Sequence, residues 1–327
     1  MTSTEPNAAP SAALYGAARN ALSSCLAVKP GESVLVVTDP GCARIGQALY
    51  RAAEELGVPR ALVEIPVAPT SGTEPPAPVA AAMAAAAVSV CPTSRSITHT
   101  AARRNACAAG GRVATMPGIT EDCMVRCLAA DYERIAEVTA RLTARLTAAR
   151  EAHLRCPHGT DLRLPLQGIT AIASSGLLRE PGQGGNLPSG EAYLMPVQGA
   201  AEGVLYVDGS MADVGVLEQP LRFEIRQGRA VSIEGGPAAE RLARALDAHG
   251  ERARNVAELG VGTNDRARIT GHVLEDEKVA GTVHVALGNN VGMGGTVDVP
   301  IHLDGVLRRP TLTLDGEVVV DGGRLTG

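Results

Sequence analysis

The sequence has few aromatic side chains: it contains no Trp, a single Phe at position 223, and five Tyr among 327 residues. Because 45% of the residues are nevertheless hydrophobic, we expect Ala, Val and Leu to fill the core. The length suits two domains or one large one. An excess of positive charge is also lacking, since the formal net charge is −5. A non-specific nucleic-acid binder is normally basic, so we expect no nucleic-acid partner.

Targeting and membrane segments are not evident either. No basic segment followed by an apolar one opens the chain, so no signal peptide is predicted. The most apolar stretch, 79–90, has about a dozen residues, whereas a bilayer-spanning helix needs about 20. The seven cysteines form no CxxC pair, and we expect most of them to be small buried hydrophobic residues rather than zinc ligands or disulfides. These features predict a cytoplasmic protein with no membrane partner.

The common nucleotide and hydrolase motifs are missing as well. After the first predicted strand the sequence DPGCARIG fits neither GxGxxG nor GxxxxGK[ST], so this turn predicts no dinucleotide or NTP site. The chain also has no GxSxG nucleophile elbow and no HExxH zinc motif.

The first half of the chain alternates strands and helices. Residues 31–39 predict a buried strand, 43–56 a helix and 61–65 a second strand, and a strand–helix–strand unit implies a parallel sheet. The alternation continues to about residue 120, with these further elements: strands at 87–90 and 112–116, a helix at 99–109, and then a long amphipathic helix over 121–152.

From residue 156 onward the pattern changes to short alternating runs that are separated by Gly, Pro, Asp-Gly and Gln-Gly, which are typical of hairpins. A helical pair at 238–248 and 251–259 interrupts them. The sequence therefore predicts an α/β N-terminal domain with a parallel sheet at 1–155. It is followed by an α+β metal-binding domain with largely antiparallel strands at 156–327.

Two histidines of the second half lie inside apolar, strand-like runs, where an unpaired imidazole is costly. They are His284 in GTVHVALG and His302 in IHLDG. In a strand, His302 and Asp304 project from the same side. Imidazole and carboxylate are standard ligands for zinc, manganese, cobalt and ferrous iron. The pattern fits half of a metal site, and the alternative is a hydrogen-bonded His–Asp pair that serves structure.

Two acidic residues could complete such a site. Glu191 ends the turn NLPSGE, and Glu258 lies at the end of the predicted helix 251–259, before a Gly-rich turn that would expose its carboxylate. Each of them alone is more often a solvated surface residue. An acidic run at 275–277 precedes Lys278; we expect solvated or salt-bridged carboxylates there, or one that orients a ligand.

The blocks NLPSGE, AELGVGTN, LEDEKVAGTVHVALG and IHLDG, in this order, resemble the metal-ligand blocks of the thermophilic metallo-aminopeptidase family, the leucyl aminopeptidases of the aminopeptidase T type. The strand GESVLVVTD and the helix after it resemble that family's N-terminal domain. The resemblance implies a homodimer in which metal-activated water hydrolyses an amide or peptide bond of a small molecule or short peptide. It implies one or two divalent ions (Zn, Mn, Co or Fe) on Glu191, Glu258, His284, His302 and Asp304.

The chain is also similar, in length and in the segment THTAARRNACAAGGRV, to the ferrous-iron 2,5-dihydroxypyridine dioxygenases, which open an aromatic ring with O₂. This similarity implies that His99 is a catalytic acid–base that reaches the metal site from the N-terminal domain. The alternative is that His99 only caps or packs against the following helix. The dioxygenases differ from this chain at four inner positions: they carry an apolar residue at 191, His at 258, an apolar residue at 284, and Ser in place of Ala286.

Three functions remain open from the sequence. Because the ligand blocks match the peptidases, our main expectation is a metal-dependent, aminopeptidase-like hydrolase, although the peptidases' Tyr shortly after the first ligand His is missing from GNNVGMGG. The alternative is a non-heme Fe(II) ring-cleaving dioxygenase that acts on a hydroxylated (hetero)aromatic. A metal-stabilised scaffold without activity is disfavoured, because structural zinc sites usually prefer thiolates.

Overall fold

The computed structural model describes residues 10–326, which form two compact units. Unit 1 comprises the described residues up to Glu133 together with Gly176–Ser189, and unit 2 comprises Arg134–Ser175 and the described residues from Gly190 onward. Among the described residues, no helix is both long enough and apolar enough to cross a bilayer.

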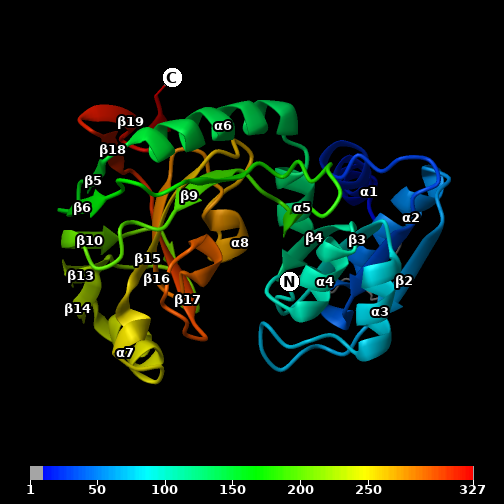
Figure 1. The fold of residues 1–327 in the computed structure, drawn as a ribbon, viewed down its shortest axis with the longest axis horizontal. Coiled ribbons are helices and arrows are strands. Elements are labelled where there is room, and N and C mark those ends of the chain that lie inside the picture. Colours follow the sequence, from blue (N-terminus) through cyan, green and yellow to red (C-terminus); the bar gives the residue numbers. More distant parts are fainter. Residues whose placement is uncertain (1–9, 327) are drawn as a thin grey trace. The chain divides into compact units, whose positions relative to one another are not determined.

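Unit 1 is built on a five-stranded parallel sheet with the order β2-β1-β3-β4-β8 (Figure 1). The parallel sheet predicted for the N-terminal half is confirmed. The last strand, β8, comes from much later in the chain than its neighbour. The strands are β1 (Val34–Thr38), β2 (Arg60–Glu64), β3 (Val88–Thr93), β4 (Arg112–Pro117) and β8 (Gly184–Asn186).

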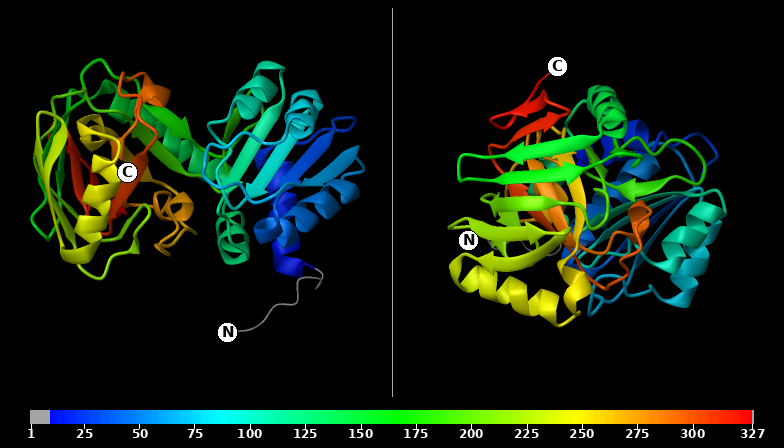
Figure 2. Two further views of the ribbon diagram at one scale, coloured as in Figure 1. Left: turned by 90° about the horizontal axis from the view of Figure 1, so that it is seen from below. Right: turned by 60° about the vertical axis from the view of Figure 1, so that its left-hand side comes forward.

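Helices cover both faces of this sheet, as buried parallel strands require. Leu35 and Val37 of β1 pack in one cluster with Met83 of α3 and Ala106 of α4, so these two helices share a face. Helices α1 and α2 pack together on the other face (Figure 2). The helices of unit 1 are α1 (Ala12–Asn20), η1 (Ala21–Cys25), η2 (Pro40–Cys42), α2 (Ala43–Glu55), α3 (Ala77–Ala85), α4 (Ala101–Ala108) and α5 (Glu121–Cys127).

The single helix predicted over 121–152 is wrong. Helix α5 ends at Cys127, a second helix, α6, runs from Tyr132 to Ala148, and the following residues begin a strand. The break has a local cause, because Oδ1 of Asp131 accepts a hydrogen bond from the backbone N–H of Glu133 at 3.1 Å. A carboxylate in this position starts a new helix by pairing a free N–H of its first turn.

Unit 2 contains two antiparallel sheets, which confirms the largely antiparallel second half. The eight-stranded sheet has the order β14-β13-β10-β6-β5-β18-β19-β20. Its strands are β5 (Glu151–Arg155), β6 (Asp161–Pro165), β10 (Glu202–Val207), β13 (Leu221–Arg226), β14 (Arg229–Glu234), β18 (Thr311–Leu314), β19 (Glu317–Asp321) and β20 (Arg324–Leu325). The hairpin turns at Gln227-Gly228 and Asp315-Gly316 have positive φ at both residues, so the predicted QG and DG turns are confirmed.

The seven-stranded sheet has the order β12-β11-β17-β16-β15-β9-β7. Its strands are β7 (Ile172–Ser174), β9 (Glu191–Leu194), β11 (Ser210–Met211), β12 (Gly215–Val216), β15 (Val256–Gly262), β16 (Val283–Gly288) and β17 (His302–Leu307). The remaining helical elements of unit 2 are α6 (Tyr132–Ala148), α7 (Gly236–Asp247), η3 (Glu251–Arg254), α8 (Val273–Asp276) and η4 (Val291–Met293).

The core of unit 2 joins apolar side chains from the two sheets, among them Phe223 of β13 and Leu259 of β15. The predicted helix 251–259 is wrong, because only its first turn is helical and Val256–Gly262 is strand β15. This strand is buried at every position and pairs with β9 on one side and β16 on the other. Pairing on both edges satisfies its backbone, so tertiary contacts override the local helical pattern.

Candidate metal centre

The five predicted ligands lie on one face of the seven-stranded sheet. Glu258 is opposite Ala286, and Ala286 is opposite Asp304, so the two carboxylates flank a small side chain across three neighbouring strands. Because alternate residues of a strand face the same side, His284 and His302 project from this face too. The intervening residues, such as Leu259 and Val285, pack into the core on the other face. Glu191, at the start of β9, is opposite Gly262.

Gly260 makes room for the first imidazole. It is paired with His284 across β15 and β16, and a Cβ atom at Gly260 would lie 2.0 Å from Nε2 and 2.3 Å from Cε1 of that ring. No real Cβ makes such contacts, so the ring lies over the glycine only because there is no side chain. From the sequence, the Gly residues after Glu258 predicted only a turn, and no local pattern pointed to this role.

The cluster is tight and mostly buried. The carboxylate of Glu258 lies between the two imidazoles, with Oε1 at 3.2 Å from Nε2 of His284 and Oε2 at 3.3 Å from Nε2 of His302. Oδ1 of Asp304 is 3.5 Å from Nε2 of His302. Glu258, His284 and Asp304 each offer one ligand atom within 4.8 Å of the others. The His302 side chain is 32% exposed, so the cluster reaches solvent on that side.

Several polar atoms of the cluster are buried without a hydrogen-bond partner among the described residues. These are Oε2 of Glu191, Nδ1 of His284 and Oδ1 of Asp304. Oε2 of Glu191 is 3.6 Å from Nε2 of His284, beyond hydrogen-bond distance. Buried polar atoms in native proteins are nearly always paired, so each unpaired one needs an explanation, and a bound cation supplies one. The residues therefore fit a divalent metal ion.

The orientation of His302 also fits a ligand. Its Nδ1 lies 2.7 Å from the carbonyl oxygen of Asn289. A carbonyl only accepts, so the Nδ1–H donates, and in the neutral ring Nε2 carries a lone pair that faces Glu258 and Asp304. A backbone acceptor that fixes the tautomer in this way is common for histidines that bind metals.

The ionisable groups perturb one another strongly. Burial raises the pKa of Glu258, but hydrogen bonds from His284 and His302 outweigh burial and lower the pKa far below its usual value. Burial lowers the pKa of His284, whereas the hydrogen bond to Glu258 and the nearby carboxylates raise it, to about 9. For His302 the effect of Asp304 and Glu258 likewise exceeds that of burial and raises the pKa. Without a metal, protons thus neutralise part of the carboxylate charge.

Lys278 is a second feature that the sequence did not single out. It is 1% exposed, and its ammonium donates to Oε1 of Glu191 at 2.7 Å and to Oε1 of Glu277. Burial raises the pKa of Glu277 to about 8, although the Lys278 charge lowers it. The other two acids of the run, Glu275 and Asp276, accept backbone N–H groups of the loop 268–271 instead.

His99 lies in unit 1, outside this cluster, in the turn before α4. Its side chain is exposed, and its carbonyl oxygen accepts a hydrogen bond from Arg104 at 2.7 Å. The cap of α4 is Thr100, whose hydroxyl accepts from the N–H of Arg103, so His99 does not serve as the cap. The cysteines are as expected mostly buried, with intermediate exposure at positions 107 and 156.

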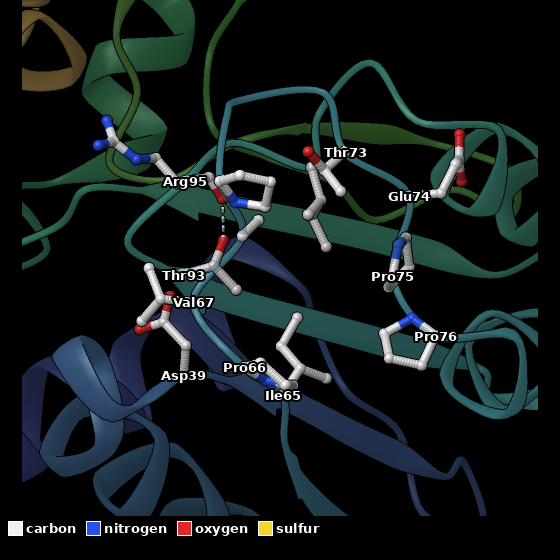
Figure 3. A pocket seen from close by; sticks show the side chains of 13 residues that line it. Asp39, Ile65, Pro66, Val67, Thr73, Glu74, Pro75, Pro76, Thr93 and Arg95 are labelled. Atoms are coloured by element: carbon white, nitrogen blue, oxygen red, sulfur yellow. Dashed lines mark hydrogen bonds between the residues drawn. The ribbon is translucent and has the colours of Figure 1, made fainter.

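Unit 1 has a pocket of about 180 Å³ beyond the carboxyl ends of β1, β2 and β3 (Figure 3). In doubly wound sheets this edge often binds ligands. Here the bordering carboxylates are already engaged: Asp39 accepts from the N–H and hydroxyl of Ser94, and Glu74 accepts from the N–H groups that begin α4. The hydroxyl of Thr93 donates to the Arg95 carbonyl. The carboxylates at this pocket therefore already have protein partners.

A doubly wound unit is followed here by an antiparallel unit that holds a buried His–carboxylate cluster, a donor set that could bind a divalent metal ion. The comparisons with known proteins specify it further. A family model described as 2,5-dihydroxypyridine 5,6-dioxygenase matches residues 13–327. The chain therefore belongs to the 2,5-dihydroxypyridine 5,6-dioxygenase family.

Individual relatives agree with this assignment. A 2,5-dihydroxypyridine 5,6-dioxygenase of Pseudomonas putida KT2440 is 29% identical over 190 residues, which are 54% of this chain and 54% of that protein. The match thus spans about half of the relative's length. The solved structure of 2,5-dihydroxypyridine dioxygenase from the same organism has a TM-score of 0.84 at 22% identity, and it covers 97% of this chain and 99% of that one. Wild-type AmpT of Thermus thermophilus has a TM-score of 0.70 at 19% identity, with 96% and 99% covered.

The family assignment corrects the main functional expectation. The sequence blocks led us to predict a metallo-aminopeptidase-like hydrolase of amide or peptide bonds, and this prediction is wrong, because the matching family is one of dioxygenases. The likeness to AmpT is one of fold alone. The blocks misled because ligand type alone does not decide whether a metal ion activates water or O₂.

Proposed function

We propose that this chain is a non-heme Fe(II) dioxygenase that opens the ring of a hydroxylated aromatic or heteroaromatic compound with O₂. The observation that carries the proposal is the family match along 13–327. We propose a class of substrates rather than one compound, because Glu258 and His284 depart from the His and the apolar residue that the resemblance to these dioxygenases leads us to expect. The compound in the family's description, 2,5-dihydroxypyridine, is the first to test.

The donor set suits ferrous iron. Two imidazoles and a carboxylate with open positions are the ligands typical of non-heme Fe(II) oxygenases. We propose His284, His302, Glu258 and Asp304 as ligands, supported by the buried unpaired Oδ1 of Asp304 and by the short distances from Glu258 to Nε2 of both histidines. When bound, the ion would supply the redox chemistry that lets O₂ react with the ring.

The protein's own groups would prepare this site. The carbonyl of Asn289 holds His302 with Nε2 available, because it accepts the Nδ1–H. The exposed side of His302 leaves an approach for a small planar substrate. We also propose that His99 moves a proton to or from the substrate, as a general acid–base in the position of the family's catalytic histidine.

The test compares metals and oxygen. Metal-free protein is loaded without air with Fe(II) or Zn(II) and then mixed with 2,5-dihydroxypyridine and O₂. We expect ring opening with Fe(II) and not with Zn(II), and one O₂ should be consumed for each substrate molecule. His302→Ala should lower iron content and activity. His249 is exposed and lies just after α7, so His249→Ala should change neither.

Two results would reject the proposal. One is turnover that proceeds without O₂, or as fast with zinc as with iron. The other is an iron-loaded protein that opens neither 2,5-dihydroxypyridine nor any member of a panel of hydroxylated pyridines and benzenes.

A further inference from the structure

The cluster contains two overlapping sets of possible ligands. Glu258, His284 and Asp304 form one set, and Glu191, Glu277 and His284 form the other, with the ligand atoms of each set within 4.8 Å of one another. Two such sets that share one residue are what a two-metal centre needs, since its ions lie about 3.5–4 Å apart. The two sets differ in what lies between their carboxylates.

In the second set the space between the carboxylates is taken by the protein itself. The Lys278 ammonium donates to Oε1 of Glu191 at 2.7 Å and to Oε1 of Glu277. Its side chain is 1% exposed, so water does not screen it. A buried cation must be paired, and Lys278 is paired with one oxygen of each of the two carboxylates in this set.

The residue type matches this role. The chain has only two lysines, Lys29 and Lys278, among 30 Lys and Arg residues. A lysine ammonium is a compact point charge with three donors, whereas a guanidinium is a planar fork. A compact cation suits the position of a single ion between two carboxylates. Lys278 lies two residues beyond the end of α8, and its backbone N–H donates to the carbonyl of Glu275 at 2.9 Å.

We propose that the Lys278 ammonium occupies the position of a second metal ion, so that the centre binds one divalent ion, at Glu258, His284, His302 and Asp304. This inference rests on the proposed function only for the identity of that ion. It gives a physical reason for one-metal chemistry on a ligand framework that resembles two-metal hydrolases. Glu191 then serves as the counter-ion of Lys278 and orients it.

The experiment counts metal ions, independently of turnover. Metal-free protein is incubated with excess Zn²⁺ or Mn²⁺, and bound ions per chain are counted by native mass spectrometry. We expect one ion in the wild type and two in Lys278→Ala, since the variant frees both carboxylates. Lys29→Ala, which removes the exposed lysine, should still bind one. The double variant Lys278→Ala/Glu277→Gln should return to one, because the second site loses a charged ligand.

A second measurement needs no variant. With ¹⁵N-labelled lysine the chain gives only two side-chain signals, and the buried Lys278 ammonium should exchange its protons slowly, unlike the exposed Lys29. We expect the slow signal to persist in the Zn²⁺-loaded protein. The inference is overturned if the wild type binds two ions, if zinc removes the slow signal, or if folded Lys278→Ala still binds one. A chain that binds one ion but opens no ring would reject the proposed function and leave this inference standing.

Discussion

Gly260→Ala would place a methyl group where the His284 ring lies. The added Cβ would be 2.0 Å from Nε2, 2.3 Å from Cε1 and 2.9 Å from Cδ2. Ordinary contacts are about 3.5–4.0 Å, so the ring would have to move by more than an ångström. His284 is 0% exposed and cannot swing into solvent. The substitution therefore removes a proposed ligand without changing any polar group.

The magnitude follows from overpacking and from the lost ligand. Adding a methyl group to a closely packed site costs about 1–3 kcal/mol of folding free energy. Misplacing a ligand should weaken metal binding on the order of 10–100-fold, as loss of the groups that orient ligands does. We expect both effects in Gly260→Ala.

Two assays separate these effects. Urea unfolding of the metal-free protein gives the change in stability, and competition with a chelator gives the metal affinity. Gly292→Ala is the matched control, because a Cβ there meets nothing within 4 Å and its φ lies outside the range that disfavours side chains. If Gly260→Ala matches Gly292→Ala in both assays, the position assigned to the His284 ring is incorrect.

Three further predictions concern the same centre. Chelation should lower the thermal stability by about 2.7 kcal/mol relative to metal at 100 times its Kd, read from melting curves, and no shift would argue against a bound ion. In metal-free protein the pKa of His284 is raised to about 9, which adds stability that is complete below about pH 6.5, the ordinary pKa, and is lost as the pH rises through 9. Metal affinity should rise over the same pH range, because the ion displaces that proton. Urea unfolding and metal titrations at several pH values should therefore show stability falling and affinity rising with pH. His99→Gln should lower kcat about 10²–10⁴-fold with metal content unchanged, and full activity would remove its proposed acid–base role.

Much of the fold could be predicted because local periodicity encodes it. The continuous apolar run over residues 34–37 predicted a buried strand, and this strand lies inside a parallel sheet. The turn at Asp315-Gly316 predicted a hairpin because few residues tolerate positive φ. The prediction for 121–152 was wrong because the carboxylate of Asp131 starts a new helix. The prediction for 251–259 was wrong because β15 pairs with a strand on each edge, which outweighs the helical spacing.

The ligand candidates were predictable from residue type and order along the chain. His302 and Asp304 share a strand face because they are two residues apart in a strand. The structure brings both of them close to Glu258 and His284. The sequence could not assign the chemistry, since the ligand blocks resemble those of peptidases whereas the matching family is one of dioxygenases.

By itself the sequence determined the kinds of element and the side chains that can bind a metal, because both depend on neighbours within a few residues. Only the tertiary structure decided that Gly260 lies under the His284 ring and that Lys278 lies between Glu191 and Glu277. These contacts depend on the register of β15 against β16 and on the path of the chain after α8. No local pattern encodes them, because the partners are up to 87 residues apart.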